Sequence, residues 1–220
     1  MGPGDEVMVP DMTFTATAAV ISHLGAVPVL IDVDPATLNI CLDRLVEALT
    51  YKTKAVIPVH YGGQAVDVVK LRSSLPERVA VVEGAAHCYP GKLHGRDIGG
   101  LSQATCFSFY ANKTITTGEG GMFVTNDPTL YETVLTLSNH GRARDETRQF
   151  WPARIGFKYK MSNIEAAVGL AQAHGAAGQH RAHAQLAHHP DLHVDGVLQA
   201  AGEQVVVVGR RAAGREFNAR

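Results

Sequence analysis

The sequence predicts an α/β fold with a mostly parallel sheet, and two observations lead to this prediction. Short apolar runs rich in Val and Ile alternate along the chain with segments in which apolar residues recur at helical spacing. The apolar runs are continuous, which is typical of strands that helices cover on both faces. In such folds ligands bind at the loops that follow the carboxyl ends of the strands.

The first βαβ unit occupies residues 6–33. Glu6–Pro10 and Val27–Val33 have the composition of strands, and Phe14–His23 between them carries Ala, Val and Ile at helical spacing. The same alternation continues, with expected helices at Cys41–Leu49 and Val66–Ser74 and expected strands at Ala55–Val59 and Val79–Glu83.

Composition limits the classes of function. The 220 residues are 45% hydrophobic and 19% charged, and the net charge of -1 gives no electrostatic case for nucleic acid or an anionic membrane. No apolar run approaches the roughly 18 to 20 residues that span a bilayer, and the first residues lack a signal-peptide pattern. Cys41, Cys88 and Cys106 are widely spaced, so we expect neither a disulfide framework nor a thiolate zinc site. We therefore expect a cytoplasmic protein that acts on small molecules.

Lys113 is the best candidate for a reactive side chain. It lies in the segment CFSFYANKTITTGEGG (residues 106–121), after an apolar strand and before a turn rich in Thr and Gly. A lysine amine in a partly desolvated site is a nucleophile that forms Schiff bases with carbonyl compounds. The alternative is an ordinary solvated lysine, as most lysines are. The flanking residues favour the reactive interpretation, and Gly118, Gly120 and Gly121 fit a tight turn behind the lysine.

Two other strands end in polar clusters. His60–Gln64 follows one expected strand, and Glu83–His87 closes another. Both clusters lie where a parallel sheet of this class binds its ligands.

The chain changes character near Gln172. The helical pattern that begins near Ser162 fades there, and residues 173–220 contain no lysine but six of the eleven histidines, between His174 and His193. These histidines share no ligand motif or helical face, so we expect no metal site. We assign residues 1–172 to one large domain and interpret residues 173–220 as a divergent tail, either frame-shifted or disordered.

Several segments, in order along residues 2–172, resemble one family. They are Phe107–Met122 with Gly2–Val7, Thr13–Phe14, Gly25–Pro28, Asn139–Arg142 and Ile155–Gln172. Together they look like the pyridoxal phosphate (PLP)-dependent nucleotide-sugar aminotransferases of the DegT/DnrJ/EryC1/StrS group. Within that group, the second half of the set is similar to the branch of perosamine synthases and 4-amino-4-deoxyarabinose aminotransferases.

The resemblance implies the large domain of a fold-type I PLP-dependent transferase, with a mostly parallel mixed sheet flanked by helices and active sites shared across a homodimer. Lys113 would bind the cofactor aldehyde and move a proton between the α-carbon of the amino donor, expected to be glutamate, and the cofactor C4′. Ser108 would contact the cofactor phosphate, although a strand-end hydroxyl bonded to backbone is the alternative. The acceptor would be a keto-sugar nucleotide.

Three further positions carry family roles. His87 matches the residue that approaches the phenolic oxygen of the cofactor, with a locally satisfied loop histidine as the alternative. Lys158 and Asn163 lie in the segment that reaches the cofactor phosphate of the neighbouring subunit, where many members have Asn in place of Lys158. His60 has either a structural or substrate-side role or a cofactor contact.

The chain also departs from the family pattern. Gly84 stands where the family has an aspartate that pairs with the pyridine nitrogen, and its absence makes the ring a poorer electron sink. Glu83 is not expected to substitute, because adjacent strand residues point to opposite faces. The phosphate-binding helix start and the small carboxyl-terminal domain of the family are also not recognised, so we expect an incomplete and impaired enzyme. The alternative from another class is a noncatalytic or regulatory PLP-binding protein of the same fold.

Overall fold

The structure is a computed structural model that describes residues 1–148, 150–173 and 207–209. The chain divides into two compact units, Met1–Phe107 and Ser108–Arg220, called here the N-terminal unit and the C-terminal unit.

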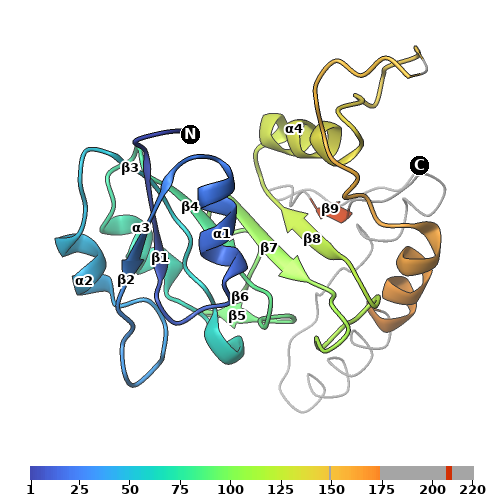
Figure 1. Ribbon diagram of the computed structural model, residues 1–220. Helices are drawn as coiled ribbons and strands as arrows, with labels where there is room; N and C mark the ends of the chain where they lie inside the picture. Colours follow the sequence, from blue (N-terminus) through green and yellow to red (C-terminus); the bar gives the residue numbers. More distant parts are fainter. Residues whose placement is uncertain (149, 174–206, 210–220) are drawn as a thin grey trace. The chain divides into compact units, whose positions relative to one another are not determined.

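The N-terminal unit is built on a parallel sheet with the strand order β2-β1-β3-β4-β7 (Figure 1). Each pairing between these neighbours is parallel. The strands are β1 (Glu6–Pro10), β2 (Val27–Ile31), β3 (Thr53–Val56), β4 (Ala80–Gly84) and β7 (Ala104–Ser108). The helices are α1 (Ala16–His23), α2 (Leu42–Glu47) and α3 (Val68–Ser73), with a 3-10 turn η1 (Tyr61–Gly63) and a hairpin of β5 (Lys92–Leu93) and β6 (Arg96–Asp97). The expected α/β class is confirmed.

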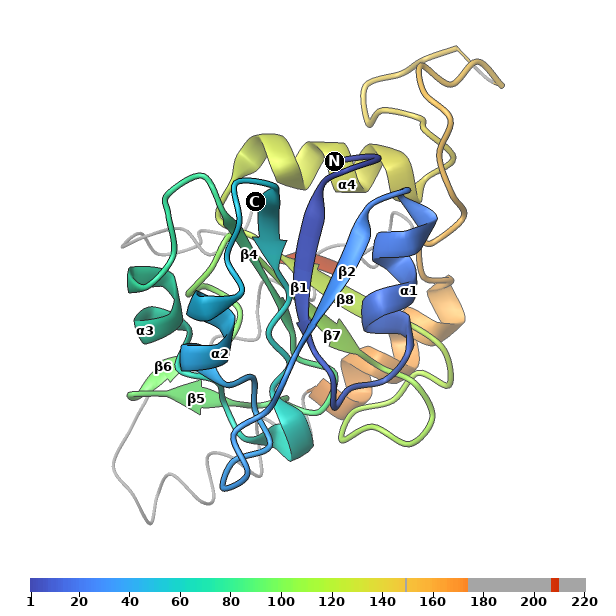
Figure 2. The same cartoon turned by 60° about the vertical axis from the view of Figure 1, so that its left-hand side comes forward.

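Helices cover both faces of this sheet. In Figures 1 and 2, α1 lies on one face, and α2 and α3 lie on the other. Helix α1 connects β1 to β2, whereas α2 and α3 connect β2 to β3 and β3 to β4, in the opposite direction along the strand order. Because crossovers between parallel strands are right-handed, the two directions place the helices on opposite faces. Val7 and Val9 pack in one cluster with Ile21 of α1. Met8 between them is fully buried, and strand alternation directs it to the opposite face.

The third strand differs from its expected bounds. We expected Ala55–Val59, but β3 ends at Val56, and Val59 forms only an isolated bridge with Gly84. Pro58 lacks an N–H group and cannot donate to a ladder. Its carbonyl still accepts the N–H of Gly84 at 2.8 Å, so the chain stays beside β4 beyond the end of β3.

The C-terminal unit contains β8 (Gly121–Val124), α4 (Pro128–Ser138), a helix over residues 163–173 and β9 (Val207–Gly209). The side chain of Asp127 begins α4 by accepting the N–H groups of Thr129 and Leu130. Strand β9 pairs in parallel with β8. Apart from Ala173 and β9, the segment interpreted as a divergent tail, including its six histidines, lies outside the described residues.

Candidate active site

Lys113 lies in the turn between Tyr110 and Gly118, whose backbones form a parallel bridge. The Lys113 N–H donates to the Tyr110 carbonyl at 3.0 Å, and the lysine side chain is half-buried. Within the described part of the chain, its Nζ atom has neither an ion pair nor a hydrogen bond. The amine is therefore available to a carbonyl ligand.

Ser108 is the last residue of β7 and is half-buried. Its Oγ accepts the backbone N–H of Tyr110 at 3.2 Å, which is the backbone contact considered from the sequence as the alternative. Because the hydroxyl acts as an acceptor in that bond, its proton stays free to be donated to an anion. The local contact and a phosphate contact are thus compatible.

The turn behind the lysine requires glycine. Gly118 and Gly120 have positive φ angles of 83° and 141°. A Cβ on Gly120 would lie 2.6 Å from the Oγ1 of Thr117 and 2.7 Å from the Cε of Met161. Gly121 begins β8.

Lys158 lies in an extended segment that docks on the end of α4. The N–H groups of His140 and Tyr159 donate to the carbonyls of Phe157 (2.8 Å) and Ser138 (2.9 Å), respectively. The Lys158 side chain is exposed, and its Nζ donates to the Lys160 carbonyl at 2.7 Å.

The surroundings of Lys158 are cationic. Burial, and then the neighbouring charges of Lys158 and Arg142, lower the pKa of Lys160. Asn163, the other candidate of this segment, is exposed at the first residue of the following helix.

The helix over residues 163–173 begins with a capping box. Ser162 N–H donates to Glu165 Oε2 at 2.7 Å, and Glu165 N–H donates to Ser162 Oγ at 3.3 Å. The N–H and hydroxyl of Ser162 hold the pKa of the Glu165 carboxyl below its ordinary value.

This cap predicts a pH-dependent step. A depressed carboxyl pKa gives a stabilisation that is complete above the ordinary value of 4.5 and is lost as the pH falls through the folded value. In an NMR titration, the Ser162 amide should therefore shift with a midpoint below 4.5. Glu165→Gln should abolish that titration while retaining the cap, since glutamine also serves in a capping box. A midpoint at or above 4.5 would contradict the cap.

In the N-terminal unit, Gly84 ends β4 and His87 follows it in a tight turn. The Cys88 N–H closes this turn on the Ala85 carbonyl at 3.0 Å, and the His87 side chain is exposed. A Cβ on Gly63 would lie 3.1 Å from the His87 carbonyl, so the turn packs directly on the loop after β3. The Sγ of Cys88 donates to the Gly63 carbonyl at 3.3 Å.

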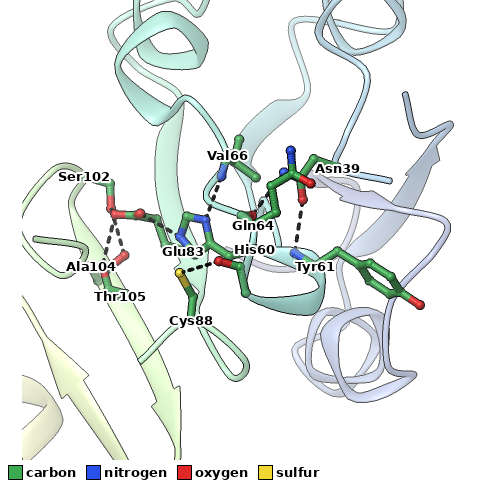
Figure 3. Close-up of polar contacts among 11 residues, drawn as sticks. Asn39, His60, Tyr61, Gln64, Val66, Glu83, Cys88, Ser102, Ala104 and Thr105 are labelled. Carbon is green, nitrogen blue, oxygen red and sulfur yellow. Dashed lines mark hydrogen bonds and ion pairs between the residues drawn. The ribbon is translucent and has the colours of Figure 1, made fainter. Parts of the chain in front are cut away.

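A largely buried polar network lies at the carboxyl end of β4 (Figure 3). Glu83 and His60 are both 0% exposed, and Glu83 Oε2 lies 2.9 Å from His60 Nε2. The other carboxylate oxygen accepts the hydroxyls of Ser102 (2.5 Å) and Thr105 (3.0 Å). His60 Nδ1 accepts the Val66 N–H at 2.9 Å, so the ring proton is on Nε2 and is donated to Glu83.

His60 thus has a structural role. Its own N–H also donates to the Gly84 carbonyl at 3.0 Å, so His60 holds β4 through both side chain and backbone. Asn39 fixes the same loop, because it accepts the Tyr61 N–H and donates to the Gln64 carbonyl.

Lys113 and Ser108 carry groups that suit the aldehyde and the phosphate of PLP, whereas no described carboxylate at the end of β4 suits its ring nitrogen. Lys113 offers a free amine for an aldehyde, and Ser108 offers a hydroxyl proton for a phosphate. At the end of β4, Gly84 has no side chain, and the hydrogen bonds of the Glu83 carboxylate go to His60, Ser102 and Thr105, so neither residue offers a free carboxylate for a ring nitrogen. These contacts agree with the expectation from strand alternation that Glu83 does not serve a ring nitrogen.

Residues 1–148, 150–173 and 207–209 hold neither a metal centre nor a membrane-spanning helix. No three His, Cys, Asp or Glu side chains in these ranges gather as ligands for a metal ion. None of the helices in these ranges combines the length and the apolar character that a bilayer crossing requires.

Neither the partners of Glu83 nor a role for Gln172 is evident from the sequence. The side chain of Gln172 makes two hydrogen bonds to Thr116, three residues after Lys113. A glutamate at the end of an otherwise apolar strand was a signal for a buried pair. No local pattern marks the contact of Gln172, whose partner is 56 residues away.

Comparison with known proteins identifies the family. The profile of the DegT/DnrJ/EryC1/StrS aminotransferase family matches residues 1–191. GDP-perosamine synthase of Caulobacter vibrioides is 43% identical over 173 residues, which are 78% of this chain and 46% of that protein. GDP-perosamine synthase of Escherichia coli O157:H7 is 41% identical over 170 residues, 77% of this chain and 46% of that protein. This chain thus spans about half the length of these curated relatives.

A solved structure agrees. The putative sugar aminotransferase Spr1654 from Streptococcus pneumoniae, in its PLP form, superposes with a TM-score of 0.71 at 33% identity, covering 78% of this chain and 49% of that one. The resemblance read from the sequence is therefore confirmed, including the perosamine synthase branch. The chain belongs to the DegT/DnrJ/EryC1/StrS family of PLP-dependent sugar aminotransferases.

Proposed function

We propose that this protein transfers an amino group from glutamate to a keto-sugar nucleotide with the help of PLP. The observation that carries the proposal is Lys113, a half-buried residue whose amine has no partner in the described residues, in a chain of the sugar aminotransferase family. The identity of 41–43% to two GDP-perosamine synthases supports a nucleotide-linked sugar as the acceptor.

Bound PLP supplies an aldehyde that condenses with amines and a ring that withdraws electrons from the adjacent carbon. Lys113 Nζ would hold the cofactor at this aldehyde. The same amine, once free, would move a proton between the donor α-carbon and the cofactor C4′. A tethered base acts at high effective molarity, and such proton transfer contributes about 10² to 10⁴ in rate. Ser108 would donate its hydroxyl proton to the cofactor phosphate, and His87 would orient the ring at its phenolic oxygen.

A homodimer is part of the proposal, with Lys158 directed to the cofactor phosphate of the neighbouring subunit. The segment that carries Lys158 also exposes large apolar side chains, among them Ile155 (97%) and Tyr159 (75%). Apolar side chains gathered on a surface mark interaction sites, and the cationic surroundings of Lys158 suit a phosphate. We assign residues 1–172 to the large domain of this enzyme and include a cytoplasmic location, which the free thiols of all three cysteines support.

A noncatalytic PLP-binding protein is the second candidate. Gly84 favours it, because a ring nitrogen without an anionic partner is less readily kept protonated and withdraws electrons poorly. The commitment of Glu83 to His60, Ser102 and Thr105 favours it further.

Borohydride reduction in the presence of PLP tests both candidates. We expect the reduced adduct on Lys113, located by peptide mass spectrometry, and its loss in Lys113→Ala but not in Lys52→Ala, which removes an exposed lysine. Trapping on Lys113 together with conversion of the bound cofactor by glutamate supports the enzyme. Trapping without conversion supports the noncatalytic protein. An adduct on another lysine, or none in a folded sample, overturns the cofactor assignment.

A further inference from the structure

Gln172 contacts the turn of Lys113 through a paired hydrogen bond. Its Oε1 accepts the Thr116 N–H at 2.9 Å, and its Nε2 donates to the Thr116 carbonyl at 2.8 Å. The flipped amide would set donor against donor and acceptor against acceptor, so these two partners fix its orientation. Gln172 thus hydrogen-bonds both backbone groups of Thr116, as the backbone of a neighbouring strand would.

The helix over residues 163–173 is shaped for this contact. Gly169 lies three residues before Gln172 and therefore on the same face. A Cβ on Gly169 would lie 2.9 Å from the Cγ2 of Thr117, so glycine permits the close approach of the helix to the turn. Ile115 and Thr117, on either side of Thr116, are buried at 5% and 8% exposure.

The rest of the turn is tied to its own strand ends. Thr116 Oγ1 donates to the Phe109 carbonyl and accepts the N–H of Gly118. The Thr117 N–H also donates to Phe109 at 2.9 Å. Within the part of the chain that the structure describes, the pair from Gln172 is therefore the contact to Thr116 that comes from outside residues 109–118.

We propose that Gln172 is a positioning residue for Lys113. By holding both backbone groups of Thr116, it fixes the part of the turn that follows Lys113. It thereby fixes the position from which Lys113 Nζ meets a carbonyl ligand. This role rests on the proposed function, because it assumes that Lys113 binds PLP. The fixing of the turn itself does not depend on the cofactor.

The test compares two variants of Gln172 with a control on the same helix. Gln172→Met keeps the length of the side chain and removes both bonds. Gln172→Glu keeps an acceptor for the Thr116 N–H but sets an oxygen against the Thr116 carbonyl. Val168→Ala trims a side chain of the helix that is 43% exposed, and serves as the control.

Two readouts separate positioning from general stability. Without cofactor, hydrogen–deuterium exchange over residues 114–118 should be about tenfold faster in Gln172→Met than in the unmodified chain. A tenfold change corresponds to roughly 1.4 kcal/mol of lost hydrogen bonding. The dissociation constant for PLP, measured well below the melting temperature, should rise by about tenfold, with a smaller rise in Gln172→Glu. Val168→Ala should change neither quantity.

Each outcome decides part of the proposal. Exchange at residues 114–118 that matches the unmodified chain overturns the fixing of the turn. Faster exchange with unchanged PLP affinity overturns the positioning of Lys113. If the unmodified chain does not bind PLP at Lys113, the proposed function fails and the positioning role fails with it, whereas the exchange result still decides whether Gln172 holds the turn.

Discussion

Gly84→Asp is expected to raise the rate at which glutamate converts the bound cofactor by about 100-fold, the scale of one well-placed electrostatic partner. The family resemblance gives position 84 the carboxylate that pairs with the ring nitrogen. Without it the nitrogen loses its proton more readily, and the ring accepts the electrons of the donor α-carbon less well. Single-turnover absorbance measurements on the full chain with PLP and glutamate provide the rate.

The geometry at Gly84 permits this substitution with a small adjustment. Gly84 does not have a positive φ, so an L side chain meets no backbone strain there. A Cβ would lie 3.2 Å from the Cγ2 of Val59 and 3.5 Å from the Pro58 carbonyl, so Val59 must yield by a few tenths of an ångström.

Gly84→Asn is the matched control, since it has nearly the same shape without the negative charge. If asparagine raises the rate as much as aspartate, charge is not the cause. An unchanged rate in Gly84→Asp would show that another residue serves the ring nitrogen. Gly84→Asp combined with Val59→Ala removes the close contact and separates a steric failure from an electrostatic one.

Glu83→Ala is expected to lower the free energy of unfolding by about 3–5 kcal/mol, the combined cost of a cavity in the core and of buried hydrogen-bond donors left without their acceptor. The substitution leaves the buried Nε2–H of His60 and the buried hydroxyl of Thr105 without their acceptor, and it removes one acceptor of the half-buried Ser102 hydroxyl. It also leaves a cavity at a position that is 0% exposed. Urea denaturation measures the loss.

The control for this prediction is Glu77→Ala, at an exposed glutamate of the same unit, which should stay within about 0.5 kcal/mol of the unmodified chain. A double-mutant cycle with His60→Ala isolates the pair. Losses that simply add would show that His60 and Glu83 do not stabilise each other, and a loss near that of Glu77→Ala would contradict the network altogether.

Local sequence patterns predicted the elements of the N-terminal unit well and their ends less well. The strand Glu6–Pro10 has its expected bounds. Helix α1 begins at Ala16 rather than Phe14, and β3 is shifted because Pro58 interrupts the ladder. The ends of an element depend on which backbone groups find partners, and those partners come from other parts of the chain.

The sequence by itself determined the fold class, the family and Lys113 as the candidate nucleophile. Hydrophobic periodicity and an ordered set of motifs are properties of the chain that are visible before it folds. Strand alternation even predicted that Glu83 could not stand in for an aspartate at Gly84.

Only the tertiary structure decided what holds Lys113 and Glu83 in place. The pair of bonds from Gln172 to Thr116 spans 56 residues, and the bond from His60 to Glu83 spans 23. Such contacts satisfy buried polar groups that folding has already removed from water, and their partners are set by which elements pack together. For that reason the reactive lysine was evident from its neighbours in the sequence, whereas the glutamine that positions it was not.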